Sequence, residues 1–474
     1  MKRAYVIGSG PNGLSAAIAL AQAGVAVEVF EAEAIPGGGA RTLPLTLPGF
    51  MHDFGSAVHP MAAGSPFFGT LQLANYGLEW IHGDFPLAHP LDDGTAVLLH
   101  RDLVDQDREF GPDAKAWRSL VQPIVDNWDI FAQDALGPVI RVPRHPWLMA
   151  RFGMAALQPA RRVATHHFKH ARTRALFAGL AAHSFLSLDD VMTSAIAIVF
   201  GASAHKVGWP IPRGGSQAIT QALIRTLESL GGVLVTGRRI DAERFREWNS
   251  PDAITLFDTS PRQLADIAGD CLTPGFRNLM MRFKRGPGAF KIDYALSRPV
   301  PWRARECRRA ISLHLGGTLE EIAESERLVN EGRHPDRPFV LVAQPSIFDD
   351  TRAVPGKHTL WAYCHVPNGS TTDMTDRIDA QIERFAPGFR DCVMTRHIST
   401  PAVLQKMDAN LLGGDISGGA MTLKQFLLRP TALTYETSAR NIFLCSSSTP
   451  PGAGVHGMCG YRAAKVALHR SGSR

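Results

Sequence analysis

The sequence has few cysteines and no paired arrangement of them. Its six cysteines stand at positions 271, 307, 364, 392, 445 and 459, so it contains no Cys-x-x-Cys pair and no zinc-finger spacing. This excludes a dithiol centre of the disulfide-reductase kind and leaves no candidate metal site. Scattered thiols are typical of a reducing compartment, and we expect a cytoplasmic protein.

The chain also lacks a long uncharged apolar run and an apolar leader. Its most apolar stretch, residues 175–202, contains Asp189 and Asp190, whereas a bilayer span needs about 20 apolar residues. The first strand is expected to begin by Ala4, which leaves no room for the apolar core of a signal peptide. We therefore expect a protein that is soluble or at most peripheral to a membrane.

Acidic residues are absent from one segment. Residues 141–174, which we call the basic segment, contain eight Lys or Arg, although the whole chain of 474 residues has a net charge of only +6. With Trp147, Leu148, Met149 and Phe152 in it, the basic segment is a candidate for contact with anionic lipid or an acidic partner. The alternative is a solvated helical face that also covers a substrate cavity. Nucleic acid is not an expected partner, because no nucleic-acid-binding motif accompanies the charge.

What the sequence does contain, at its start, is a complete β-α-β unit. A strand over residues 4–8 runs into Gly-Ser-Gly-Pro-Asn-Gly, an amphipathic helix follows, and a second strand ends at Glu31. The glycines permit a tight turn and close approach to a pyrophosphate, which the helix N-terminus attracts. Glu31 would bind ribose hydroxyls and repel a 2′-phosphate, which indicates FAD or NAD rather than NADP. The predicted contacts are Gly8, Gly10, Pro11, Asn12, Gly13, Glu31 and Ala32.

A second glycine cluster selects between the two dinucleotides. Gly37, Gly38 and Gly39 are followed by Arg41, shortly after Glu31. Here the sequence resembles the family of FAD-dependent oxidoreductases that includes phytoene desaturases and amine oxidases. GPGAFKIDYALSRPVPW and PPGAGVHGMCG resemble its phytoene-dehydrogenase-related branch, which includes proteins like pyridine nucleotide-disulphide oxidoreductase domain 2. The resemblance covers nearly the whole chain and implies FAD as the cofactor.

The resemblance also implies where the chain contacts FAD. Gly38, Gly39 and Arg41 match the residues that lie along the pyrophosphate in that family. The C-terminal segment, residues 445–460, is expected to pack against the flavin ring, where a helix N-terminus suits the negative edge of the reduced flavin. The remaining implied contacts are Gly55, Ser56, Arg238, Ile240, Ser447, Gly454, Val455, His456 and Met458. One departure is that residues 237–253 are charged, so we expect the family's three-stranded meander there to be shortened or lost.

The composition along the chain predicts an α/β fold with two interleaved domains. The Rossmann-type FAD-binding domain is assigned to residues 1–79, 205–270 and 435–474. An α+β substrate domain takes residues 80–204 as its helical part and residues 271–434 as its sheet part. Several of the latter's apolar runs alternate with polar residues, which predicts an antiparallel sheet. Such a domain can roof an apolar cavity beside the flavin.

Three histidines are candidate catalytic residues. His59 closes a loop expected near the flavin, His183 lies in an apolar helix, and His456 stands in the C-terminal segment. Each could take part in proton transfer, but each also has an ordinary structural alternative, such as a local hydrogen bond or a cap. The sequence does not decide between these roles.

Three functions remain open at this point. The first is an FAD-dependent dehydrogenase or oxidase that takes a hydride from an apolar small molecule and leaves a C=C or C=N bond. Because neither Cys-x-x-Cys nor a second Gly-x-Gly-x-x-Gly is present, its electrons would pass to an acceptor such as dioxygen or a quinone. The second is a non-redox isomerase that uses reduced FAD. The third is a flavin-containing binding or scaffold protein.

Overall fold

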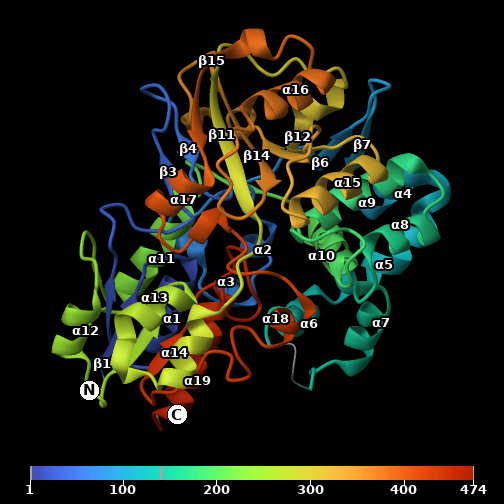
Figure 1. The fold of residues 1–474 in the computed structure, drawn as a ribbon. Coiled ribbons are helices and arrows are strands. Elements are labelled where there is room, and N and C mark those ends of the chain that lie inside the picture. The colour runs from blue at the N-terminus through green and yellow to red at the C-terminus, as the bar shows by residue number, and fades with distance from the viewer. Residues whose placement is uncertain (1–2, 139–141, 473–474) are drawn as a thin grey trace.

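The structure, a computed structural model, describes residues 3–138 and 142–472. Residues 1–2 and 473–474 at the ends of the predicted domain ranges, and Arg141 in the basic segment, lie outside the described residues. Two large sheets organise the chain (Figure 1). One is parallel and five-stranded, and the other is mixed and seven-stranded. The prediction of an α/β fold with a Rossmann-type sheet and a second, mostly antiparallel sheet is therefore confirmed.

The parallel sheet has the strand order β16-β10-β1-β2-β9. Its strands are β1 (Arg3–Ile7), β2 (Ala26–Phe30), β9 (Val233–Val235), β10 (Ile254–Phe257) and β16 (Ile442–Leu444). From β1 the chain moves outward through β2 to β9, and then continues on the other side of β1 with β10 and β16. The order therefore reverses beside β1. In open α/β sheets, ligands bind at the carboxyl ends of the strands at such a point.

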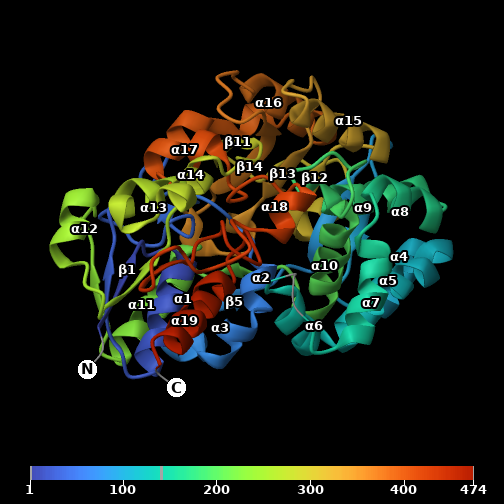
Figure 2. The same ribbon diagram turned by 60° about the horizontal axis from the view of Figure 1, so that its bottom comes forward.

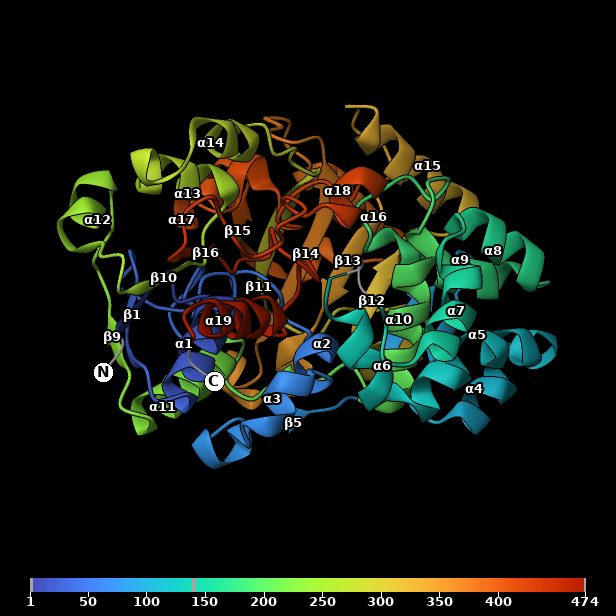
Figure 3. The ribbon, with the colours of Figure 1, turned by 90° about the horizontal axis from the view of Figure 1, so that it is seen from below.

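Helices cover both faces of the parallel sheet, because successive side chains of a strand point to opposite faces. Val6 and Leu256 join the core that includes α1 (Pro11–Gln22), α11 (Gln217–Ser229) and α19 (Met458–Arg470). Ile7 and Phe257 join the core of α12 (Ala242–Trp248), α13 (Pro261–Ala268) and α14 (Pro274–Met281). Helix α12 fills the connection from β9 to β10, so the expected loss of the meander is confirmed. The last helix, α19, lies beside the first, α1 (Figures 2 and 3).

The second sheet has the order β15-β11-β14-β13-β12-β6-β7, and all its pairs except β6 with β12 are antiparallel. Its strands are β6 (Phe85–Pro90), β7 (Ala96–Leu99), β11 (Gly288–Leu296), β12 (Ala310–Leu315), β13 (Val340–Ala343), β14 (His358–Val366) and β15 (Val393–Ser399). Helix α16 (Thr375–Phe385) packs on one of its faces. The prediction of residues 80–204 as helical is wrong at its start, where β6 and β7 complete this sheet. Strand β6 is buried along its whole length, so its sequence lacks the alternation that marks a half-exposed strand.

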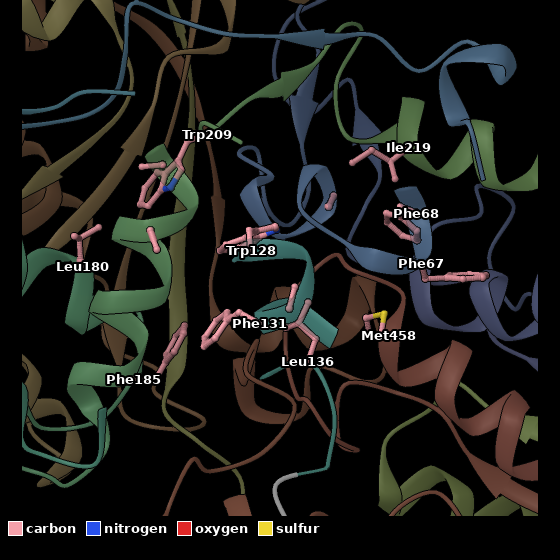
Figure 4. Close-up of a cluster of buried hydrophobic side chains, with 14 of the residues drawn as sticks. Phe67, Phe68, Trp128, Phe131, Leu136, Leu180, Phe185, Trp209, Ile219 and Met458 are labelled. Carbon is pink, nitrogen blue, oxygen red and sulfur yellow. The ribbon is translucent and has the colours of Figure 1, made fainter. Parts of the chain in front are cut away.

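A further group of helices forms a layer beside the second sheet. They are α4 (Leu103–Phe110), α5 (Ala114–Asp126), α6 (Trp128–Ala135), α7 (Pro146–Ala156), α8 (Ala160–His167), α9 (Ala171–Ala182), α10 (Thr193–Lys206) and α15 (Leu319–Asn330). Figure 4 shows buried side chains from this layer, including Leu180 and Phe131, in one cluster with Phe67 and Met458. Among the described helices, none combines the length and the apolar character needed to cross a bilayer.

Candidate active site

One cavity of about 460 Å³ extends from the carboxyl end of β1 to a face of the second sheet. Three of the predicted cofactor contacts, Gly13, His456 and Met458, do not line it. The ones that do are Gly8, Gly10, Pro11, Asn12, Glu31, Ala32, Gly38, Gly39, Arg41, Gly55, Ser56, Arg238, Ile240, Ser447, Gly454 and Val455. The fold thus brings residues from both ends of the chain to one cavity, and their roles toward a cofactor stay predictions.

The glycine loop at the start of α1 lies against a buried carboxylate that follows β10. The Gly13 N–H donates to Asp258 Oδ2 at 2.8 Å, and a Cβ on Gly10 would lie 2.6 Å from the same oxygen. Burial raises the pKa of Asp258 to about 7, and Asp408 and Glu31 act in the same direction. Sequence analysis missed Asp258, because only the pairing of β1 with β10 brings it to a glycine 245 residues away.

The Glu31 carboxylate is fixed at the cavity wall by backbone and hydroxyl donors. Its Oε2 accepts from Ser9 N at 3.0 Å and from Ser9 Oγ at 2.6 Å, and its Oε1 accepts from Glu33 N at 2.9 Å. A carboxylate has about four acceptor sites, so one is left for a ribose hydroxyl. Asn12 Oδ1 is buried and has no partner among the described residues. Both groups fit the adenosine diphosphate half of a dinucleotide.

Arg41 is held by two carbonyl groups at the same wall. Its Nε donates to Gly38 O and its Nη2 donates to Met407 O, both at 2.7 Å. The guanidinium also lies 4.7 Å from the Phe54 ring centroid. A guanidinium has five N–H donors, so three are left for an anion in the cavity. This arrangement fits a pyrophosphate beside the glycine loop.

The C-terminal segment divides into a part that lines the cavity and a part that packs. Gly454 and Val455 line the cavity, whereas the ring of His456 is buried and its Nδ1 accepts from Met458 N at 3.0 Å. Met458 belongs to the hydrophobic core (Figure 4). A Cβ on Gly460 would lie 1.7 Å from the carbonyl oxygen of Asn12, so this glycine permits the close packing of α19 on α1.

The far end of the cavity is apolar and aromatic. Trp361 and Tyr363 of β14 and Ala289 of β11 contribute from the second sheet, and Phe185 and Phe200 contribute from the helical layer. The sequence provides such a wall because alternate residues of paired strands share a face. This end can enclose an apolar molecule.

Known proteins match this arrangement. Residues 6–71 match the family model described as NAD(P)-binding Rossmann-like domain. The chain is 24% identical to the Mus musculus pyridine nucleotide-disulfide oxidoreductase domain-containing protein 2, over 98% of this chain and 92% of that protein. It is 25% identical to the lycopene-forming phytoene desaturase of Pantoea ananas, over 99% of each. The chain is thus similar, over nearly its whole length, to phytoene desaturases and to pyridine nucleotide-disulfide oxidoreductase domain-containing protein 2.

The fold is also similar to the solved structure of cyclohexylamine oxidase from Brevibacterium oxydans IH-35A. The two structures share a TM-score of 0.59 at 15% sequence identity, and the match covers 99% of each chain. The likeness therefore includes the second sheet and the helical layer as well as the parallel sheet.

The second sheet places a buried ion pair at the cavity. Lys291 of β11 lines the cavity, is 4% exposed, and contacts the carboxylate of Asp293. Burial lowers the pKa of Lys291, which Asp293 opposes, and burial raises the pKa of Asp293 to about 6. Sequence analysis missed both residues. The available signal was a pair of charges at alternate positions of the apolar strand AFKIDYAL, which puts both on one face.

A second buried ion pair joins β4 (His52–Asp53) to Arg352, which lies in the connection between β13 and β14. Arg352 Nη2 lies 2.8 Å from Asp53 Oδ2, and both side chains are at most 1% exposed. Asp53 Oδ1 accepts from Ser216 N at 2.8 Å. The pair thereby fixes the start of α11 next to the loop that carries Ser56 and His59.

His59 lines the cavity, but its ring N–H donates a hydrogen bond to Ser216. The Ser216 hydroxyl donates to Ser56 O at 2.6 Å, so the contact of 2.8 Å between His59 Nε2 and Ser216 Oγ has His59 as the donor. Burial lowers the pKa of His59 to about 4. This geometry favours a structural role for His59 over proton transfer. The hydrogen bond that His456 Nδ1 accepts from Met458 N, at the start of α19, favours a structural role for His456 as well.

His183 is the third candidate histidine. It lines the cavity, and its hydrogen bond is to another histidine and not to the loop of His59 or the start of α19. Its half-buried ring lines the cavity, and its Nε2 lies 2.9 Å from Nε2 of the buried His314. Burial lowers the pKa of His183 to about 3 and that of His314 well below its usual value. Both rings are therefore neutral near pH 7, and one of them donates to the other. A catalytic role for His183 stays a prediction.

Proposed function

We propose that this protein is an FAD-dependent dehydrogenase or oxidase that removes a hydride from an apolar small molecule and leaves a C=C or C=N bond. The observation that supports this most is the continuous cavity from the glycine loop to the aromatic face of the second sheet. The similarity of the whole chain to phytoene desaturases is consistent with it. One relative is named a phytoene desaturase, which agrees with formation of a C=C bond, and one structural neighbour is named a cyclohexylamine oxidase, which agrees with oxidation of an amine.

The chain's own residues would hold the cofactor along this cavity. Glu31 would bind the ribose, while the N-terminus of α1 and Arg41 would face the pyrophosphate. The backbone at Gly55, Ser56, Gly454 and Val455 would lie against the ring. Bound FAD would supply the group that accepts the hydride.

The substrate would occupy the aromatic end of the cavity. Lys291 lies in its wall with its charge balanced by Asp293, and the rest of this end is apolar, so a neutral molecule would be favoured there. His183 lines the cavity and stays the candidate for contact with the substrate, although its lowered pKa makes it a weak proton acceptor near pH 7. The electrons would leave to an acceptor such as dioxygen or a quinone.

Anaerobic flavin reduction tests this function. The purified FAD-loaded protein would be mixed without oxygen with fractions of hydrophobic metabolites, and the flavin absorbance followed. We expect one fraction to bleach the flavin and dioxygen or a quinone to restore it. A fraction that is isomerised without net use of an acceptor would instead support the isomerase, and stable FAD with no turnover would support the scaffold.

A further inference from the structure

Helix α7, inside the basic segment, carries an apolar stripe that faces solvent. Trp147, Met154 and Leu157 are 88%, 71% and 60% exposed. They are seven and three residues apart, so they lie on one side of the helix. Ala156, which is buried, lies on the opposite side from Trp147. Scattered exposed apolar side chains are common, but three large ones in a row on one helix indicate a surface that contacts something apolar.

Positive charge surrounds this stripe. Arg144, Arg151 and Arg162 are exposed, and residues 142–174 include no Asp or Glu. Arg151 lies between Trp147 and Met154 on the same side of the helix. Trp and Leu on one side of a helix together with Arg at its edges are typical of helices that lie in the headgroup region of a bilayer.

A groove beside the stripe adds to the same surface. It has a volume of about 620 Å³, lies between α5 and α7, and is lined by Trp147, Leu148, Arg151 and Lys115. Within the described part of the chain, neither Lys115 nor Arg151 forms an ion pair. The groove also includes Asp126, which accepts a hydrogen bond from Gln122 at 2.7 Å. The groove therefore combines free cations with an apolar wall, which suits an anionic headgroup.

The position of α7 leaves the stripe accessible. The helix lies at the lower end of the helical layer in Figure 1, and its inner side packs on α10 and α5. Helix α10 contributes Phe200 to the cavity wall on its other side. The stripe is thus separated from the cavity by one helix.

We propose that α7 docks the protein on a bilayer surface that carries anionic lipid. Trp147, Met154 and Leu157 would enter the boundary between headgroups and acyl chains, while Lys115 and Arg151 would contact the headgroups. The charge alone would also suit an acidic protein. A bilayer fits better than an acidic protein, because projecting apolar side chains can enter it directly, whereas a protein partner would need a matching apolar groove. The protein would lie on the membrane and not cross it.

Vesicle sedimentation of the full-length, FAD-loaded protein tests this docking. We expect binding to vesicles of phosphatidylcholine with phosphatidylserine, weak binding to phosphatidylcholine alone, and release by salt, since salt screens the headgroup charge. The double substitution Trp147→Ala with Met154→Ala should weaken the partition at least about tenfold, because two apolar side chains no longer enter the bilayer.

The matched control removes apolar surface elsewhere. Leu279→Ala with Met281→Ala changes two exposed side chains of α14, which are 49% and 43% exposed, and should leave vesicle binding unchanged. Flavin content and the melting temperature of each variant show that it is folded. Wild-type protein that ignores anionic vesicles, or a Trp147 and Met154 variant that binds as well as wild type, would overturn the proposal. Since no turnover is measured, this outcome is independent of the proposed redox activity.

Discussion

At the residue scale, the dinucleotide end of the cavity holds several carboxyl groups. Glu31, Glu33, Asp258 and Asp408 all line it, and Asp258 lies directly at the glycine loop. Its other titratable neighbours are Cys445 and Cys459, whose thiols stay neutral because burial raises their pKa values. A pyrophosphate would bring further negative charge to this place. The ionisation of Asp258 should therefore oppose cofactor binding.

We predict that FAD affinity falls as the pH rises through about 7. The pKa of Asp258 is raised to about 7, so its carboxyl is neutral below that pH and charged above it. Binding that needs the neutral form would weaken by at most about tenfold per pH unit above the pKa. The Kd would be measured by quenching of FAD fluorescence at about pH 6 and about pH 8.

Asp258→Asn is the control for this prediction. An Asn side-chain oxygen can still accept from the Gly13 N–H, so the loop is retained while the charge is removed. Its Kd should be the same at both pH values. A wild-type Kd that also does not change with pH would show that the carboxyl does not ionise next to the cofactor.

The buried pair of Arg352 and Asp53 gives a prediction on stability. Arg352→Leu leaves the carboxylate of Asp53 charged and unpaired in the interior, which should cost about 3–5 kcal/mol of unfolding free energy. Urea unfolding followed by circular dichroism would measure it. Arg327→Leu, which breaks an exposed pair with Glu324, should change stability little. Equal losses in the two variants would contradict the assigned role of the buried pair.

At the scale of elements, the contact of α19 with α1 connects the C-terminal segment to the glycine loop. Gly460→Ala puts a Cβ where the Asn12 carbonyl oxygen now lies at 1.7 Å, so one helix must shift. We expect a loss of about 1–3 kcal/mol in stability together with weaker FAD binding, because Asn12 belongs to the loop.

Gly153→Ala is the matched control for this substitution. Gly153 lies inside α7, and a Cβ there meets no heavy atom within 4 Å. Alanine should leave stability unchanged or raise it by up to about 1 kcal/mol. The account of the helix contact fails if Gly460→Ala is as well tolerated, by urea midpoint and FAD Kd, as Gly153→Ala.

Local spacing was enough to predict the elements that begin the dinucleotide site. The β-α-β unit, with Gly8, Gly10 and Glu31, follows from residues close together in sequence, and so does the lost meander. Asp258 and Lys291 could not be predicted in this way, because strand pairing places them at the cavity. The packing role of Gly460 and the hydrogen bond from Met458 N to His456 were also not predictable from spacing. Both depend on the contact between α19 and α1, two helices from opposite ends of the chain.

At the scale of the whole molecule, the two sheets contribute different parts of the proposed site. The parallel sheet presents the groups that fit a dinucleotide, and the second sheet presents Lys291 and an aromatic wall to the same cavity. The strands of the parallel sheet all fall within the three ranges assigned to the FAD-binding domain, although the boundaries themselves remain a prediction. The helical layer closes the cavity on one side and carries α7 on the other.

The flavin content of the purified protein tests the central claim, that this cavity holds FAD, most directly. Protein purified without added cofactor would be denatured, and the released flavin identified and quantified by absorbance and mass spectrometry. We expect FAD in equimolar amount, and its loss in Gly10→Val, whose side chain would collide with the Asp258 carboxylate. Protein that is folded but contains no flavin, and that FAD at millimolar concentration does not load, would contradict the account.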